Sequence, residues 1–118
     1  MLRVNSRIRD YIKNYVMNKS PGVFILLNRV VRERLGMDLV DAIIKKPRDF
    51  LKLLKSFYGD EMEAAFIYRS LFLKALAVMA GDPELDKELF KAAMNGCSQL
   101  VAVLRSHGVD VSTEICED

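Results

Sequence analysis

Residues 60–81 read DEMEAAFIYRSLFLKALAVMAG, and this stretch decides the fold class. Asp60 can accept hydrogen bonds from the first free N–H groups of a helix, and Gly81 can end that helix in the left-handed conformation. The stretch between them is apolar nearly all round, and its middle is polar only at Arg69, Ser70 and Lys74. A helix of this kind belongs at the centre of a bundle. We therefore predict a central helix over residues 61–80.

Prolines and glycines mark further helix boundaries on both sides of this stretch. Proline suits the first position of a helix, and glycine suits the residue after its end. Pro21 is followed by Gly36, and Pro47 by Gly59. Apolar residues between these markers recur with the helical period. The sequence thus predicts an all-α, single-domain bundle of five or six helices, with bounds near 6–18, 21–35, 39–45, 47–58, 61–80 and 83–107.

The last predicted helix opens at Pro83 and contains an internal Asn95-Gly96. An apolar stripe continues through this dipeptide, from Leu85 to Leu104, so we favour one helix to about His107. A kink at Gly96 is the alternative. Residues 109–118 then form a loose or docking tail. The 118 residues are enough for one core and one domain.

Composition excludes some classes of protein. Hydrophobic residues make up 51% of the chain and charged residues 29%, which is typical of a globular protein and not of a disordered one. Arg69 and Lys74 would be costly inside a bilayer, so we expect no membrane span over 62–80. Cys97 falls among small residues, and we interpret it as a packing residue. We expect Cys116 to be exposed, and the two cysteines could pair only if the tail folds back.

The sequence gives little support for catalysis. His107 is the only histidine, and its place near a helix C-terminus suits a structural role. There is no glycine-rich phosphate loop and no cluster of cysteines with metal-ligand spacing. We therefore expect no enzyme, no metal and no cofactor.

Charge is distributed unevenly along the chain. Residues 1–36 carry 8 Lys and Arg against 2 Asp and Glu, whereas residues 82–118 carry 3 against 8. Such asymmetry suggests that one end could meet an acidic partner, or that the two ends could meet each other in a dimer.

Nucleic-acid binding is the sharpest interpretation of the basic residues. Arg48, Lys52 and Lys55 are spaced to form one helix face, and Lys45 and Lys46 stand just before it. Cations near a helix N-terminus are mildly unfavourable, and a local conflict of this kind can mark a functional site. The alternative is that these charges simply form a solvated face.

The charges inside the central helix have three interpretations. Arg69 and Lys74 could extend their stems to the edge of the bundle, or pair with Glu63 or another acid. They could instead line, with Tyr68, a pocket for an anionic ligand. The third interpretation is that this helix leaves an apolar face exposed, which buries against a second chain.

A short pattern adds a resemblance. Residues 41–50 read DAIIKKPRDF, followed by Leu53-Leu54 and then Phe57-Tyr58-Gly59. Over residues 35–76 the chain resembles small archaeal all-helical output domains, in which such a segment precedes a short amphipathic helix, a glycine and a long helix. Members of that family stand alone or are attached to signalling and transcription proteins. The resemblance implies an archaeal interaction domain with a role in regulation, and it brings no catalytic residues.

We conclude from the sequence that this is a small, non-catalytic interaction or regulatory module. We expect it to be cytoplasmic and to form a homodimer, and a different protein partner is also compatible with the sequence. The first alternative is a nucleic-acid-binding protein that uses the basic face at 45–55. The second is a small-molecule sensor with a pocket along residues 61–80.

Overall fold

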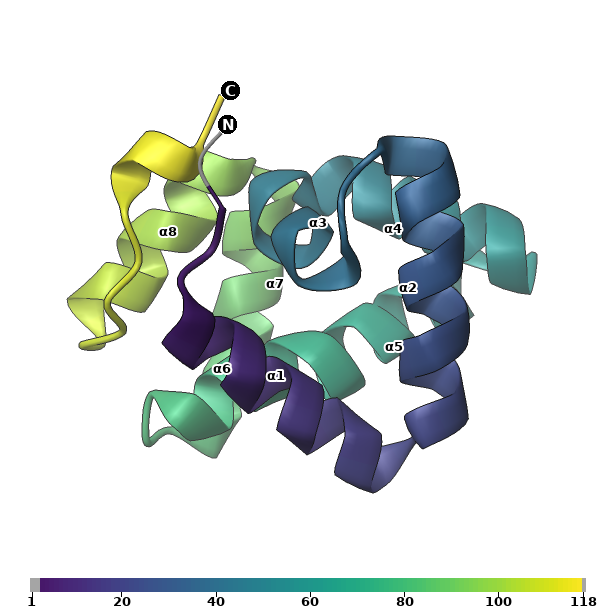
Figure 1. The fold of residues 1–118 in the computed structure, drawn as a ribbon. Coiled ribbons are helices and arrows are strands. Elements are labelled where there is room, and N and C mark those ends of the chain that lie inside the picture. Colours follow the sequence, from purple (N-terminus) through teal and green to yellow (C-terminus); the bar gives the residue numbers. More distant parts are fainter. Residues whose placement is uncertain (1–2, 118) are drawn as a thin grey trace.

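The computed structural model of the chain describes residues 3–117 and contains helices and connecting turns, without a strand in this range. The predicted all-α bundle is therefore confirmed (Figure 1). The α-helices are α1 (Ser6–Lys19), α2 (Pro21–Leu35), α3 (Leu39–Lys45), α4 (Pro47–Tyr58), α5 (Glu61–Ile67), α6 (Lys74–Met79), α7 (Asp86–Met94) and α8 (Cys97–Ser106). A π-helical segment, η1 (Tyr68–Leu73), joins α5 to α6, and short 3-10 turns occupy Pro83–Leu85 and Thr113–Ile115.

The predicted helix boundaries in the first half of the chain are nearly all correct. Asn5 caps α1 by accepting a hydrogen bond from the Ile8 N–H, and Asp38 caps α3 by accepting from the Asp41 N–H. Pro21 and Pro47 open α2 and α4. Side-chain oxygens and prolines satisfy or remove the N–H groups that a helix start leaves unpaired.

The central helix is present, but it is not α-helical throughout. It runs as α5, η1 and α6, and it packs against α1, α4 and α7. The π-helical turns of η1 bury Tyr68, Phe72 and Leu73 together. Phe50 of α4 stacks edge-on against Tyr68 and Phe72, with ring centroids 5.1 and 5.4 Å away. These aromatic contacts lie at the centre of the core.

The prediction of one helix from Pro83 to His107 is wrong. The chain breaks at Asn95-Gly96 into α7 and α8, which pack against each other. Gly96 has φ 111° and ψ 175°, a conformation that is essentially restricted to glycine. The apolar stripe continues through the break because α7 and α8 both direct apolar residues into the core. Hydrophobic spacing alone therefore does not reveal the break.

The tail docks on the bundle. Val109, Val111 and Ile115 are buried, and the Arg105 guanidinium donates to the Val111 carbonyl at 3.0 Å. The tail folds back far enough for Cys97 and Cys116 to form a disulfide. The interpretation of Cys97 as a simple packing residue, and of Cys116 as an exposed one, is therefore wrong.

Candidate interaction surface

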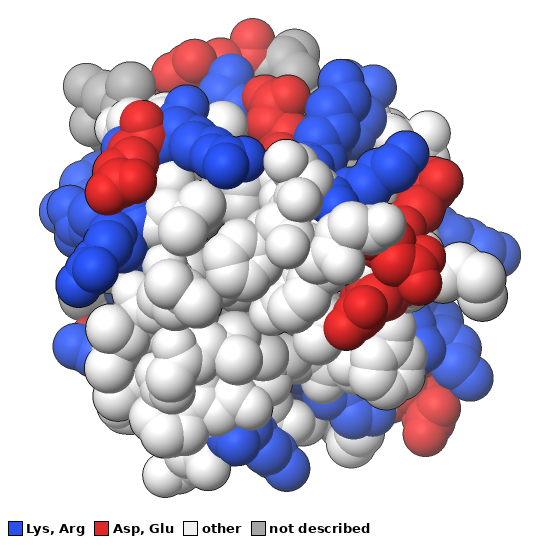
Figure 2. Space-filling model, turned by 90° about the vertical axis from the view of Figure 1, so that its right-hand side faces the viewer, with Lys and Arg blue, Asp and Glu red and all other residues white. Residues whose placement is uncertain are grey.

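The large apolar side chains that remain exposed lie on one side of the molecule. In the described part of the chain they come from α2 and from the corner where α4 meets α5, both at the right of Figure 1. Figure 2 views this side and shows a broad uncharged area with charged side chains around its edge. The exposed large apolar side chains of these elements are Ile25, Leu26, Phe57, Met62 and Phe66, and we call them together the apolar face.

Helical spacing explains how α2 contributes to the apolar face. Its buried residues are Phe24, Leu27 and Val31, which point into the core. Leu26 belongs to a second stripe that also contains Val30 and Arg34, at the spacing of one helix face. The Arg34 guanidinium lies 3.4 Å from the Ser56 hydroxyl of α4. This stripe therefore faces the α4–α5 corner, and 45% of Leu26 remains exposed.

The α4–α5 corner supplies the most exposed apolar side chains. Met62 is 82% exposed and Phe66 is 58% exposed, and their spacing of four residues puts them on one face of α5. Phe57 stacks edge-on against Tyr58 with ring centroids 5.1 Å apart. Burial and, secondarily, the Glu63 carboxylate raise the pKa of the Tyr58 phenol.

Charged side chains lie beside the apolar face. Exposed Arg29 and Arg34 extend from α2, with Glu33 between them in sequence. Asp60, Glu61 and Glu63 surround the start of α5, and Lys55 pairs with Glu61 at 3.7 Å. The corner thus has a net charge of −2, and the Arg34 guanidinium extends from α2 toward Ser56 of α4 beside it.

The structure separates the five basic residues predicted to contact nucleic acid. Arg48, Lys52 and Lys55 lie exposed on the outer face of α4, as predicted. Lys45 is only 5% exposed, because the whole of α3 is buried, so it does not belong to the exposed basic face of α4. Lys46 is half-buried and lies 3.8 Å from Glu117 of the docked tail.

Arg69 and Lys74 converge on one buried acid. The Arg69 guanidinium lies 2.9 Å from Asp86, and the Lys74 ammonium lies 3.9 Å from Asp86 and donates to the Pro83 carbonyl at 2.6 Å. Asp86 is 3% exposed, so its carboxylate stands where an anionic ligand would be expected. Tyr68 is completely buried and donates to the Ile43 carbonyl at 2.7 Å. These contacts support pairing with an acid and not a ligand pocket.

A second ion-pair cluster ties the N-terminal segment to α3. Asp38 and Asp41 are 5% and 3% exposed, and both pair with Arg3 and Arg9. The Asp41 carboxylate also accepts from the Val4 N–H at 2.9 Å. Burial lowers the pKa of Arg9, and the Asp41 carboxylate opposes that shift. Every oxygen of this cluster has a donor, so the cluster is structural.

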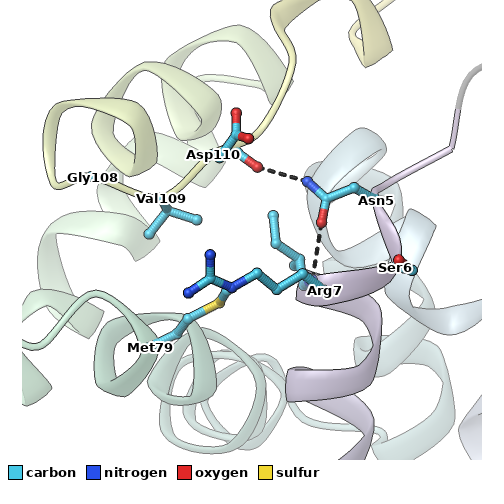
Figure 3. A pocket seen from close by; sticks show the side chains of 8 residues that line it. Asn5, Ser6, Arg7, Met79, Gly108, Val109 and Asp110 are labelled. Atoms are coloured by element: carbon cyan, nitrogen blue, oxygen red, sulfur yellow. Dashed lines mark hydrogen bonds between the residues drawn. The ribbon is translucent and has the colours of Figure 1, made fainter.

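A polar hollow of about 290 Å³ lies where the N-terminal segment meets the tail (Figure 3). The Asn5 side chain bridges its rim, since its Nδ2 donates to the Asp110 carbonyl at 2.6 Å and its Oδ1 accepts from Ile8. Arg7 extends across the hollow toward Met79 (Figure 3). The lining residues include neither histidine nor cysteine.

Residues 3–117 contain no group of His, Cys, Asp and Glu able to hold a metal ion, and none of their helices is long and apolar enough to cross a membrane. Comparisons of the chain with protein-family models, curated proteins and solved structures found no match.

Sequence reasoning identified part of the candidate interaction surface. One of its three interpretations of the central helix was an uncovered apolar face, and Met62 and Phe66 are exposed there. It did not anticipate the share of α2, although residues 23–27 read VFILL. Five consecutive apolar residues of a helix span all directions around its axis, so some of them must face away from the core. That signal could have found Ile25 and Leu26.

Proposed function

We propose that this chain is a small, non-catalytic interaction module that self-associates through the apolar face. The observation that supports the proposal is that the exposed large apolar residues of the described part of the chain, residues 3–117, belong to α2 and the α4–α5 corner. Scattered exposed apolar residues need no explanation, but a contiguous area rimmed by charges is typical of a binding surface. Phenylalanine and methionine are also enriched in the cores of interfaces.

The rest of the molecule favours binding over chemistry. The buried acids that could have served as catalytic groups are each paired with arginine or lysine. Tyr68 is used inside the core. By contrast, the fold leaves the apolar side chains of the face exposed to water. Their burial against a partner would be favourable.

The proposal is tested by the double substitution Met62→Ser/Phe66→Ser. Both side chains are largely exposed, so we expect the thermal unfolding of the single chain to change little. We expect association, measured by light scattering after size exclusion over a series of chain concentrations, to be lost. Ala102→Ser, at an exposed position of α8 away from the face, is the control. A variant that associates as the parent chain does would rule out this surface.

Nucleic-acid binding is the second candidate, and the outer face of α4 favours it. Among the described residues, Arg48 and Lys52 are exposed and form no ion pair. The mechanism requires an affinity that falls steeply with salt, and Arg48→Glu/Lys52→Glu should weaken it. Lys87→Glu/Lys91→Glu on α7 makes the same charge change elsewhere. Equal losses in the two variants would show that only net charge matters.

Origin and location remain proposals. The resemblance over residues 35–76 suggests an archaeal regulatory domain, and we place the chain in the cytoplasm. Disulfides are rare in most cytoplasms but are common in those of hyperthermophilic archaea. The mass of the chain, isolated from its source with thiols blocked at lysis, distinguishes a reducing cytoplasm from one in which disulfides form. Cys97 and Cys116 each carry one blocking group if they are reduced, and neither does if they form the disulfide.

A further inference from the structure

We infer that the hollow between α1 and α2 binds a phosphate group, which Lys13 of α1 and Asn28 and Arg32 of α2 hold together. This site is independent of the proposed self-association, because none of the residues that line the hollow belongs to the apolar face. The class of ligand follows from the nitrogen donors that the fold leaves unused there.

The hollow lies where α1 and α2 diverge from the turn that joins them, with α3 between their far ends (Figure 1). It has a volume of about 220 Å³. Each of the two helices lines it with a pair of nitrogen-bearing side chains four residues apart, a spacing that places both members on one helix face. The pairs are Arg9 and Lys13 on α1, and Asn28 and Arg32 on α2. Two helix faces therefore present donors to the same hollow.

The buried acid that lines the hollow is already supplied with donors. The Asp38 carboxylate accepts from the guanidinium groups of Arg3 and Arg9. It also accepts from the Asp41 N–H at 2.9 Å. Arg32 lines the same hollow but forms no ion pair within residues 3–117. Burial lowers the pKa of Arg9, and the positive charges of Arg3 and Arg32 act in the same direction. A bound anion would balance the charge that Arg32 adds.

Asn28 adds a donor that is held in place by the fold. Its Oδ1 accepts from the Leu39 N–H at 3.0 Å, so the side-chain NH2 group remains for other partners. In the described part of the chain this NH2 group has no hydrogen-bond partner, and it is not sealed off from solvent. Lys13 is exposed and likewise forms no ion pair there. Three donor groups are thus free to meet one ligand.

Phosphate suits these donors better than a carboxylate does. Its oxygens point in tetrahedral directions, whereas those of a carboxylate lie in one plane, and the donors come from two different helices. Guanidinium groups match phosphate oxygens two at a time. A phosphate monoester carries a charge of about −1.5 to −2 at neutral pH, which matches Lys13 and Arg32. Asp10 also lines the hollow and opposes an anion, so two free cations act against one acid.

The size of the hollow limits the ligand. Sites for drug-sized molecules have volumes of roughly 300–1,000 Å³, and this hollow is smaller. The ligand is therefore either the free phosphate ion or a small phosphate monoester.

An NMR titration of the isotopically labelled chain tests the site. Inorganic phosphate and glycerol phosphate are the probes, and sodium chloride at matched ionic strength is the reference. Lys13→Gln and Arg32→Gln should each weaken phosphate binding at least about tenfold, because each removes a charged donor. Arg29→Gln removes an exposed cation of α2 that does not line the hollow, so this matched control should bind phosphate as the parent chain does. Asp10→Asn should bind phosphate more tightly, because the opposing acid is gone.

The two probes distinguish the sources of the phosphate group. Tighter binding of inorganic phosphate identifies the free ion, and tighter binding of glycerol phosphate identifies a monoester; either result supports the site. Lys13 and Arg32 are exposed, so both variants should fold, and circular dichroism verifies it.

Three results would overturn the inference. One is a parent chain whose resonances respond to neither probe beyond the chloride reference. Another is a loss in Arg29→Gln as large as that in Arg32→Gln, which would show that only net charge matters. The third is weaker binding by Asp10→Asn. None of these results bears on self-association, which Met62→Ser/Phe66→Ser tests separately.

Discussion

At the scale of single residues, the fold depends on buried charges that are fully paired. Asp41 receives the Val4 N–H and the guanidinium groups of Arg3 and Arg9. The cluster joins residues 29 to 38 positions apart in sequence, which is why hydrophobic spacing and capping rules do not predict it.

Asp41→Ala should lower the free energy of unfolding by about 3 kcal/mol, because it leaves the Val4 N–H without its acceptor and the partly buried Arg9 with Asp38 alone. Urea denaturation measures the loss. Asp49→Ala, at an exposed acid in the first turn of α4, is the matched control and should cost about 1 kcal/mol or less. Equal effects of the two substitutions would show that the Asp41 cluster adds nothing to stability.

Tyr68 makes stability depend on alkaline pH. Burial raises the pKa of its phenol in the folded chain well above the ordinary value. In the unfolded chain the phenol therefore ionises at a lower pH than in the folded chain, at about 10. The stability from this group is complete below about pH 10 and is lost as the pH rises above it.

Tyr68→Phe should therefore reduce the steepness of the fall in unfolding free energy above about pH 10. At neutral pH the variant should be less stable by about 1 kcal/mol, because the hydrogen bond to the Ile43 carbonyl is lost. Tyr58→Phe is the comparison, since the pKa of that half-buried phenol is raised for the same main reason. An unchanged alkaline profile of Tyr68→Phe would contradict the assignment.

At the scale of helices and turns, local chemistry decides where the chain bends. The sharpest case is Gly96, whose positive φ separates α7 from α8. Gly96→Ala should lower the free energy of unfolding by about 1–3 kcal/mol, because a side chain is strained in that conformation.

Gly22→Ala provides the matched control for Gly96→Ala. Gly22 lies in the first turn of α2, and an added methyl group there would meet nothing within 4 Å. Alanine favours a helix more than glycine does, so this substitution should be neutral or stabilising by about 1 kcal/mol at most. Thermal unfolding of both variants makes the comparison, and a neutral Gly96→Ala would mean that the break does not require glycine.

The helices that could be predicted are those whose ends carry their own chemical signals. Pro21, Asp38, Pro47 and Asp60 each mark a helix start that the structure confirms. The break at Gly96 was only an alternative, because Leu89 and Leu100 on either side are both buried and continue the apolar pattern. The π-helical turns of η1 carry no local signal of this kind, since they depend on tertiary packing of Tyr68 and Phe72.

Only part of the candidate interaction surface could be predicted from the sequence. The apolar surplus of the central helix is visible in the sequence, and Met62 and Phe66 confirm it. The place of α2 beside the α4–α5 corner is a property of the fold, so the sequence could not show that both contribute to one face. It also could not show that Arg69 and Lys74 share Asp86.

At the scale of the whole molecule, the disulfide connects the tail to the bundle. Cys97 and Cys116 are 19 positions apart, and closing a loop of that size in the unfolded chain stabilises a fold by about 3 kcal/mol. Reduction, or Cys97→Ser/Cys116→Ser, should lower the midpoint of urea unfolding accordingly. The bundle should stay folded, because Val109, Val111 and Ile115 hold the tail independently. Loss of all helical signal on reduction would contradict this view of the tail.

At this scale we propose that a second copy of the chain covers the apolar face. Sedimentation equilibrium of the parent chain beside Met62→Ser/Phe66→Ser is the most direct measurement. The chain has a mass of 13.4 kDa. We predict that the parent chain approaches twice this mass as its concentration rises, whereas the variant keeps the mass of one chain. A parent chain with the mass of a single copy at every concentration would contradict the account.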